Sequence, residues 1–209
     1  DFRAVYKAEE DPWHIGNADY GRYNYYFKLI NQFAANKEDI LDIGCGFGAF
    51  LARFKDSFHH LYGLELEEAA VRKGRERFPF ITFIPGSAGD LESAISNKIF
   101  DVIIISDVIC YLNEKGKNRA LKWVADHLRK NGVALIAGWS PGKQYLTYDE
   151  LRNLVLKYFK LESERMLESD HAVFIARKKR HLIAMTIDYE TWQPIPPGKN
   201  IDWEKDIFS

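Results

Sequence analysis

Cysteine is scarce in this chain, which has only two among its 209 residues. Cys45 lies in a glycine-rich segment and Cys110 follows an apolar run, so their number and spacing indicate neither a disulfide framework nor a zinc site. The six histidines show no metal-ligand spacing either. We therefore predict no metal site, and a reducing compartment such as the cytoplasm fits this cysteine usage best.

Long hydrophobic runs and an excess of one charge are also missing. No apolar run approaches the roughly 18 residues that a membrane-spanning helix needs, and the formal net charge is -1. A nearly neutral chain gives no general reason to expect nucleic acid or an anionic membrane as a partner. With 46% hydrophobic and 28% charged residues, the composition predicts one well-packed domain, and we expect a small or neutral substrate.

The most informative segment is 40–51, where a short apolar run stops at alternating glycines. The apolar run predicts a buried strand, and the glycines predict a tight turn that leads into a helix. These glycines are Gly44, Gly46 and Gly48. Because glycine has no Cβ, a ligand can lie against the backbone, close to the free N–H groups at the start of the helix. The segment therefore predicts a ligand site.

The glycines alone do not identify that ligand, because Gly44, Gly46 and Ala49 also satisfy the looser dinucleotide fingerprint. Asp42 favours a cation, since a carboxylate two residues before the first glycine repels a pyrophosphate and attracts an ammonium or sulfonium group. S-adenosylmethionine carries both of these cations. Glu65, at the end of the next predicted strand, can accept both hydroxyl hydrogens of a ribose.

These and later motifs resemble those of class I S-adenosylmethionine-dependent methyltransferases. The matching segments follow one another within about residues 10 to 180, at 42–48, Glu65, 100–107 and 128–136. The resemblance implies a doubly wound, Rossmann-like α/β sheet of seven strands in the order 3-2-1-4-5-7-6, with strand 7 antiparallel. It also implies S-adenosylmethionine as the cofactor and S-adenosylhomocysteine as its product.

The expected cofactor contacts come from the glycine-rich turn and from the ends of three further strands. They are Asp42, Gly44, Cys45, Gly46, Gly48, Glu65, Leu66, Ser87, Ala88 and Asp107. An acidic residue that usually meets the adenine amino group in this family aligns with Ser87. Ser87, backbone groups or Asp90 would have to make that contact here.

Periodicity predicts that strands and helices alternate along the chain. The predicted helices are 20–33, 49–58, 67–78, 117–129 and 148–159, and the predicted strands are 40–43, 60–65, 80–84, 100–106, 133–137, 160–167 and 171–177. Thr147 and Glu150 form a capping box at the start of the last helix. The turn between the last two strands is too short for a parallel crossover, so they form an antiparallel hairpin, which a standard dinucleotide fold does not have.

Candidate catalytic and substrate residues follow the fourth strand or lie near the start of the chain. Asp107 is either a functional carboxylate or a helix N-cap, and Tyr111 either faces the acceptor or packs in the core. His14 is a further candidate for acceptor contact. A sugar hydroxyl would gain from a general base such as Asp107, His14 or His171, whereas an amine needs only to arrive deprotonated. The expected substrate wall consists of Trp13, Tyr20, Tyr26 and Tyr111.

We divide the chain into an aromatic-rich lid or substrate segment (1–35), a methyltransferase domain (36–180) and a C-terminal extension (181–209). The extension resembles the opening strand of a polysaccharide deacetylase domain, with Asp188 and Glu190 as the matching acids. Alternatively, it is an arm that packs on the methyltransferase.

Segments near the start of the chain and at 110–112 resemble nodulation-factor N-methyltransferases and related enzymes that act on saccharides. We therefore expect methyl transfer to a hydroxyl or amine of a carbohydrate or glycoconjugate, in a protein fused to a deacetylase domain. Two alternatives remain. A nicotinamide-dependent oxidoreductase is disfavoured by Asp42 and the terminal hairpin, and a non-catalytic domain with a vestigial cofactor site is disfavoured by the intact motifs.

Overall fold

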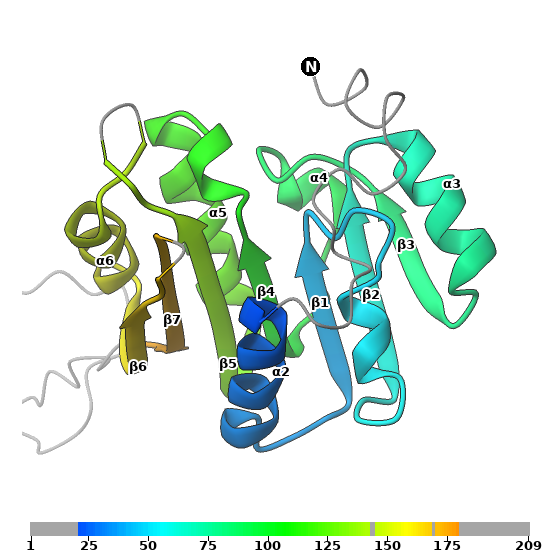
Figure 1. Cartoon of the computed structure of the whole chain (residues 1–209). Coiled ribbons are helices and arrows are strands. Elements are labelled where there is room, and N and C mark those ends of the chain that lie inside the picture. Colours follow the sequence, from blue (N-terminus) through cyan, green and yellow to red (C-terminus); the bar gives the residue numbers. More distant parts are fainter. Residues whose placement is uncertain (1–20, 143–144, 169, 180–209) are drawn as a thin grey trace, which may run out of the picture. The chain divides into compact units, whose positions relative to one another are not determined.

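The computed structural model describes residues 21–142, 145–168 and 170–179, which form one α/β domain (Figure 1). Its sheet has seven strands in the order β3-β2-β1-β4-β5-β7-β6. β7 runs antiparallel to both β5 and β6, and the other neighbouring strands are parallel. The predicted fold class, strand order and antiparallel seventh strand are therefore confirmed.

The elements alternate through most of the described chain. The strands are β1 (Asp39–Ile43), β2 (His60–Glu65), β3 (Ile81–Pro85), β4 (Phe100–Ser106), β5 (Leu128–Trp139), β6 (Phe159–Met166) and β7 (His171–Lys178). The helices are α2 (Gly21–Phe33), α3 (Glu68–Arg77), α4 (Leu91–Ala94), α5 (Glu114–His127) and α6 (Tyr148–Leu156). Two short 3-10 helices, η1 (Leu51–Phe54) and η2 (Ile109–Tyr111), follow β1 and β4.

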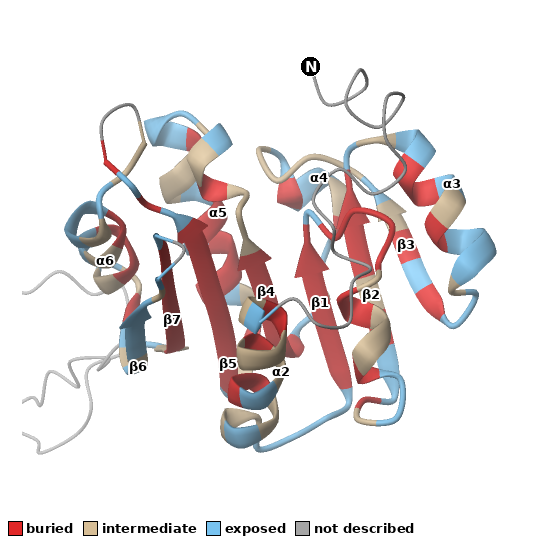
Figure 2. Cartoon of the chain, viewed as in Figure 1, coloured by how far each residue is buried: buried red, intermediate tan, exposed pale blue. Residues whose placement is uncertain are grey.

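The central strands are buried on both faces, as parallel strands covered by helices are. Successive residues of a strand point to opposite faces, so Ile40 and Ile104 pack with α2, η1 and α3, whereas Leu41 and Ile103 pack with α4, α5 and α6. Figure 1 shows α2 in front of the sheet and α5 behind it, and Figure 2 shows the strands between them as buried. Two apolar cores therefore hold the sheet rigid and fix the positions of the loops at its carboxyl edge.

Three predicted helices differ from the structure, and the one predicted over 148–159 ends at Leu156, with Phe159 already in β6. Residues 49–58 form only η1 and turns, because the N–H groups of Arg53 and Lys55 bond to carbonyls three residues earlier and tighten the chain beyond an α-helix. The helix predicted over 117–129 begins instead at Glu114, where the Asn113 side chain accepts the N–H of Gly116 as an N-cap. It ends at His127, since Arg129 is drawn into the sheet by ion pairs with two aspartates.

Candidate functional site

A pocket of about 560 Å³ opens at the carboxyl edge of the sheet, where ligands bind in open α/β folds. Its volume lies in the usual range for small-molecule sites. The turn after β1, the ends of β2 and β4, the end of β5 and the first residues of α2 and β7 all contribute to its lining. The pocket thus joins the glycine-rich turn to residues from the opposite half of the sheet.

The glycine-rich turn needs glycine for two separate reasons. Gly44, Gly46 and Gly48 have φ values of 77°, 57° and 85°, in the left-handed region that favours glycine. A Cβ at Gly44 would collide with Val108, and one at Gly48 would lie 2.7 Å from the ring of Phe83. Gly44 and Gly46 line the pocket, whereas Gly48 is needed for packing of the turn against β3.

Cys45 is not part of the pocket lining, although we expected it to contact the cofactor. Its side chain is buried, and its Sγ lies only 2.6 Å from where a Cβ on Gly63 would stand. Burial raises the pKa of the Cys45 thiol well above its usual value, and the carboxylates of Asp42 and Glu65 raise it further. Cys45 is therefore a small core residue that holds the turn against β2.

Glu65 is fixed in the pocket by the backbone around it. Its Oε2 accepts the N–H of Gly46 at 2.9 Å, and its Oε1 accepts the N–H groups of Leu66 at 2.8 Å and Glu67 at 3.0 Å. A carboxylate offers about four acceptor positions, so these bonds orient the group and leave capacity for a ligand. Glu65 and the exposed Leu66 both line the pocket.

Asp42 lies behind the pocket wall and is only 5% exposed. Burial, together with the neighbouring charge of Glu65, raises the pKa of its carboxyl to about 7. A buried carboxyl of this kind gains its charge near neutral pH or when a cation approaches. Asp42 can therefore act on a ligand electrostatically through the turn, although it does not line the pocket.

The loop after β3 supplies the wall beyond Glu65. Ser87 and Ala88 line the pocket, and the Ser87 hydroxyl accepts the N–H of Gly89 at 3.1 Å. Asp90, the alternative we considered for the adenine amino group, belongs to the lining of a different hollow.

Three charged or titratable side chains meet on the other side of the pocket. Asp107 Oδ2 lies 3.4 Å from Arg22 Nη2, and Asp107 Oδ1 lies 3.4 Å from His171 Nε2. Arg22 also contacts the imidazole of His171 directly. All three residues line the pocket, and we call them the polar cluster.

Asp107 is held in a fixed orientation within the polar cluster. It has a φ of 56°, and its carboxylate accepts the backbone N–H of Trp139 at 3.1 Å and the Ser106 hydroxyl at 3.2 Å. Burial by itself would raise the pKa of Asp107, but the hydrogen bond with His171 and the charge of Arg22 outweigh it, so this pKa lies below its usual value. Asp107 is therefore ionised at neutral pH and is a weak base.

Exposed aromatic rings line the same side of the pocket. Tyr111 is 58% exposed, so it is not packed in the core, and Trp139 is 42% exposed. The ring of Tyr145 lies 4.9 Å from that of Trp139. Sequence reasoning missed Trp139 and Tyr145, because their positions beside the pocket depend on how β5 and the following loop meet it.

Tyr26 does not lie in the substrate wall, where we expected it. Tyr26 is fully buried between α2 and the sheet, with its ring edge-on to Tyr23 and Phe50, and it is absent from the pocket lining. Tyr23, one turn earlier, lines the pocket instead. The other predicted acceptor residues, Trp13, His14 and Tyr20, lie outside the described residues.

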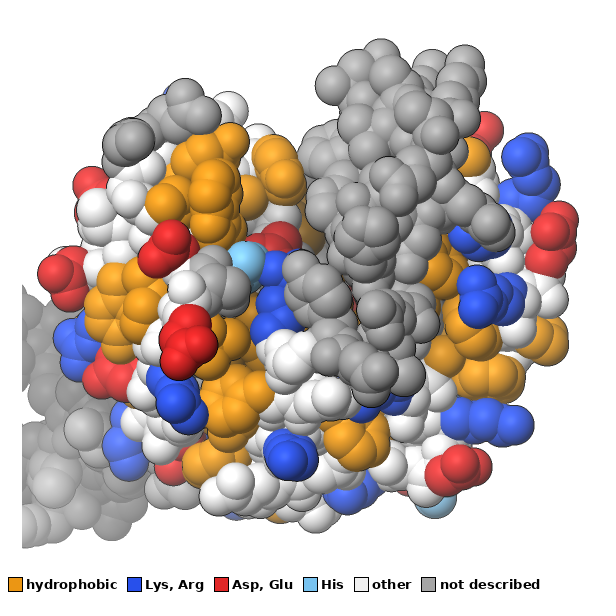
Figure 3. All heavy atoms as spheres, in the orientation of Figure 1, with side chains coloured by type: hydrophobic (Ala, Val, Ile, Leu, Met, Phe, Trp, Pro, Cys, Tyr) orange, Lys and Arg blue, Asp and Glu red, His pale blue; other side chains and the backbone are white. Residues whose placement is uncertain are grey.

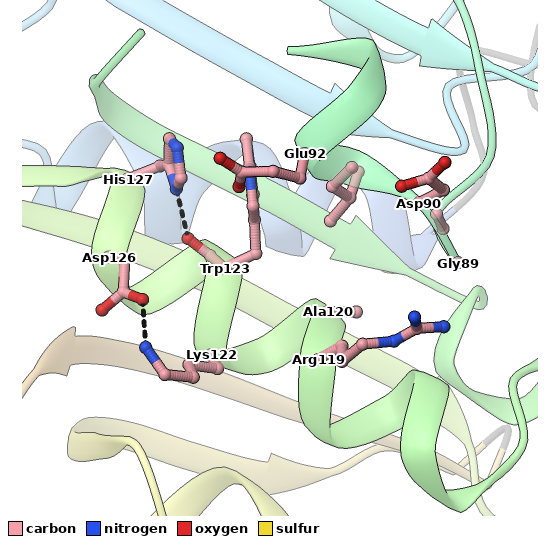
Figure 4. Close-up of a pocket in the computed structure, with 11 residues that line it drawn as sticks. Gly89, Asp90, Glu92, Arg119, Ala120, Lys122, Trp123, Asp126 and His127 are labelled. Carbon is pink, nitrogen blue, oxygen red and sulfur yellow. Dashed lines mark hydrogen bonds and ion pairs between the residues drawn. The ribbon is translucent and has the colours of Figure 1, made fainter. Parts of the chain in front are cut away.

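A second, smaller hollow of about 270 Å³ lies beside α4 and α5 (Figure 4). The rings of Trp123 and His127 stack there at 3.9 Å, and His127 Nδ1 lies 2.8 Å from the carbonyl oxygen of Trp123. Lys122 pairs with Asp126 across one helical turn at 2.5 Å. These contacts lie mainly within α5, and of the predicted cofactor residues only Ala88 borders this hollow. The larger pocket is therefore the candidate functional site.

Neither a metal centre nor a membrane-spanning helix is found in the described part of the chain. Within it, no cluster of three or more histidine, cysteine, aspartate or glutamate side chains is arranged to hold a metal ion. Nor does that part contain a helix with the length and apolar character required to cross a bilayer.

Comparison with known proteins supports the assignment that the motifs predicted. Residues 40–132 match the family model of a methyltransferase domain. The chain is 28% identical over 112 residues to the dTDP-3-amino-3,4,6-trideoxy-alpha-D-glucopyranose N,N-dimethyltransferase of Streptomyces venezuelae, covering 53% of this chain and 46% of the relative. It is 24% identical over 113 residues to nodulation protein S of Rhizobium tropici, covering 54% and 48%. The chain thus spans about half the length of the curated relatives it matches.

Solved structures share the fold over more of the chain. The N-methyltransferase NodS of Bradyrhizobium japonicum, in complex with S-adenosylhomocysteine, has a TM-score of 0.71 and 14% identity and covers 85% of this chain and 97% of its own. The PH0226 protein of Pyrococcus horikoshii has a TM-score of 0.73 and 20% identity, covering 86% and 100%. Residues 40–132 therefore match a methyltransferase domain, and the described chain has the fold found in solved S-adenosylmethionine-dependent methyltransferases. The prediction of this class is confirmed.

Proposed function

We propose that this chain transfers a methyl group from S-adenosylmethionine to an amine of a carbohydrate acceptor. The observation that carries the proposal is that one pocket joins the glycine-rich turn and Glu65 to the polar cluster around Asp107. Among the similar proteins, the Streptomyces venezuelae enzyme is named as an N,N-dimethyltransferase of an amino sugar, NodS as an N-methyltransferase, and MtfA as a glycopeptide N-methyltransferase. These names favour nitrogen over oxygen as the acceptor atom.

The residues on the cofactor side fit S-adenosylmethionine. Gly44 and Gly46 present bare backbone to the pocket, which is the surface that the methionine part of the cofactor would need. Glu65 would accept the ribose hydroxyls, and Ser87 and Ala88 would border the adenine. When bound, S-adenosylmethionine supplies an electrophilic methyl group on a positively charged sulfur, and S-adenosylhomocysteine is the product.

The residues on the acceptor side can orient an amine. Asp107 is ionised and fixed by three neighbours, so it offers a hydrogen-bond acceptor in a constant place. An N–H of a neutral amine that donates to this carboxylate turns the nitrogen lone pair in a defined direction, which is the positioning that such a transfer requires. Because Asp107 is a weak base, we assign it positioning of the amine rather than removal of its proton, which passes to solvent.

Two broader predictions belong to the same proposal. We propose that the reaction takes place in the cytoplasm, in keeping with the cysteine usage. We also propose that residues 181–209 begin a polysaccharide deacetylase domain, because removal of an acetyl group from an N-acetylated sugar would expose the amine that the methyltransferase uses. Asp188 and Glu190 lie outside the described residues.

An assay with isotopically labelled S-adenosylmethionine tests the choice of acceptor atom. A glucosamine tetrasaccharide and its fully N-acetylated counterpart serve as matched acceptors that differ only at nitrogen. We expect label on the free amines and none on the acetylated chain. Equal labelling of both would show transfer to a hydroxyl, and labelling of neither would contradict the proposal of a carbohydrate acceptor.

A further inference from the structure

Trp139 is placed unusually for a residue of β5. Residues 132–138 of the strand are all buried, and the strand then ends at Trp139, which is 42% exposed and lines the pocket. Figure 2 shows this change from buried to exposed at the end of β5. Large aromatic side chains contribute most when they are covered, so an exposed indole at the mouth of a pocket is well placed to contact a ligand.

Two other aromatic residues lie around the same side of the pocket. The Tyr145 ring is tilted by 55° from the Trp139 ring, with 4.9 Å between their centroids. Tyr111 comes from η2, after β4, and is 58% exposed. In the space-filling view, hydrophobic side chains gather above the end of β5, next to a histidine (Figure 3). Strands β4 and β5 thus bring separate aromatic side chains to one wall.

The polar cluster lies directly beside this wall. Trp139 is the strand partner of His171, and its backbone N–H donates to Asp107 at 3.1 Å. An aromatic face next to charged hydrogen-bonding groups matches a sugar ring, which has an apolar C–H face and hydroxyl or amino groups at its edge. A purely apolar acceptor would leave the charged groups without a ligand partner and would cost binding energy.

We propose that Trp139, supported by Tyr145 and Tyr111, is the surface on which a pyranose ring of the acceptor stacks. The proposal rests on the proposed function and deepens it, because it assigns carbohydrate recognition to the end of β5. Stacking on Trp139 would place the edge of the sugar ring, and an amine on that edge, next to Asp107. The indole is then a residue that positions the acceptor and determines its class.

Calorimetric titration with a glucosamine tetrasaccharide, in the presence of saturating S-adenosylhomocysteine, tests this assignment without turnover. We expect Trp139→Leu to weaken saccharide binding at least tenfold, which is about 1.4 kcal/mol, and Trp139→Phe to weaken it less because a ring remains. Affinity for S-adenosylhomocysteine alone should stay within about twofold. The backbone N–H that binds Asp107 is unchanged in both variants, so the polar cluster keeps that contact.

Phe80→Leu is the matched control, since Phe80 is similarly exposed at 38% and lies outside the pocket lining. It should leave saccharide binding unchanged, and thermal unfolding should show that all three variants are folded. If Trp139→Leu binds the saccharide as tightly as the parent protein, the stacking surface is wrong while the proposed function stands. If the parent protein binds S-adenosylhomocysteine but no saccharide, the acceptor class and the stacking surface both fail. If it does not bind S-adenosylhomocysteine, the proposed function fails as well.

Discussion

The two ends of the sheet each place aspartate and arginine together, but in different surroundings. At the amino end, Arg129 bridges Asp39 at 2.5 Å and Asp101 at 3.2 Å, and the two aspartate side chains are 6% and 2% exposed. At the carboxyl end, Arg22 lies 3.4 Å from Asp107, whose side chain is 28% exposed and faces the pocket. Similar chemical groups therefore form a closed cluster at one end and an accessible one at the other.

The difference separates an ion pair that holds strands from one that is available to a ligand. Asp101 accepts the N–H groups of Glu38 and Asp39, so the amino-end cluster ties β1, β4 and β5 together. Asp107 also accepts a backbone N–H, but it retains exposed surface toward the pocket. We infer that burial of the carboxylate, rather than the presence of an ion pair, distinguishes the structural cluster from the functional one.

Asp107→Asn should have the largest effect on activity. Asparagine tolerates the left-handed backbone conformation and keeps the shape of the side chain, but its amide lacks the charge that holds Arg22 and orients an amine. We expect kcat/KM for a glucosamine tetrasaccharide to fall on the order of 100-fold, because the amine is no longer held in position, with a melting temperature lowered by only a few degrees. Steady-state kinetics and thermal unfolding measure the two quantities.

The matched substitution at the opposite end is Arg129→Gln, and its main effect should be on stability. It leaves two buried carboxylates without their guanidinium partner, although Lys98 still pairs with Asp39 at 3.0 Å. Since Arg129 is itself partly exposed, we expect the free energy of unfolding, measured in urea, to fall by about 2 kcal/mol, which is below the range for fully buried pairs. Affinity for S-adenosylhomocysteine should be unchanged. A large loss of affinity for S-adenosylhomocysteine in Arg129→Gln, or a large loss of stability in Asp107→Asn, would contradict the distinction between a structural and a functional cluster.

Asp42 should give a smaller, pH-dependent effect. Its pKa rises from the usual 3.8 to about 7 in the folded chain, so the native state holds a proton that the unfolded state has lost between these values. Stability in the absence of ligand should therefore decrease as pH rises from about 4 to about 7. The affinity for S-adenosylmethionine, which is cationic, should instead increase as pH rises through about 7, because Asp42 becomes ionised.

The two predictions are tested at about pH 5.5 and about pH 8, which lie below and above this pKa. Urea unfolding measures the stability, and calorimetry measures the affinity for S-adenosylmethionine, in the parent protein and in Asp42→Asn. The variant should lose most of the pH dependence attributed to this carboxyl. If the parent protein and Asp42→Asn respond to pH in the same way, Asp42 is not the titrating group.

Much of the fold could be predicted because its signals are local. The short turn between β6 and β7 requires an antiparallel pair, and Thr147 with Glu150 forms the predicted capping box. The errors also arose locally. The Asn113 cap makes α5 begin earlier than its periodicity predicts, and the apolar residues of 49–58 predict a longer helix than the 3-10 turn that forms.

The site could be predicted only where one motif supplies several residues. Gly44, Gly46 and Glu65 follow from the pattern around β1 and β2, but Arg22 and His171 are separated by 149 positions and meet only after the sheet has formed. The aromatic spacing of α2 likewise indicates a helix without showing which ring faces the pocket. The same spacing therefore allows Tyr26 to face the pocket, whereas packing places it in the core.

The most direct test of the account is calorimetric titration of the chain with S-adenosylmethionine, S-adenosylhomocysteine and NAD. We expect the first two to bind and NAD not to bind. Glu65→Gln should weaken both at least tenfold, because the ribose would lose a charged acceptor. Glu92→Gln, a matched change beside the smaller hollow, should leave the affinities unchanged. Binding of NAD in preference to S-adenosylmethionine, or equal affinities in the Glu65→Gln and parent proteins, would contradict the assignment of this pocket.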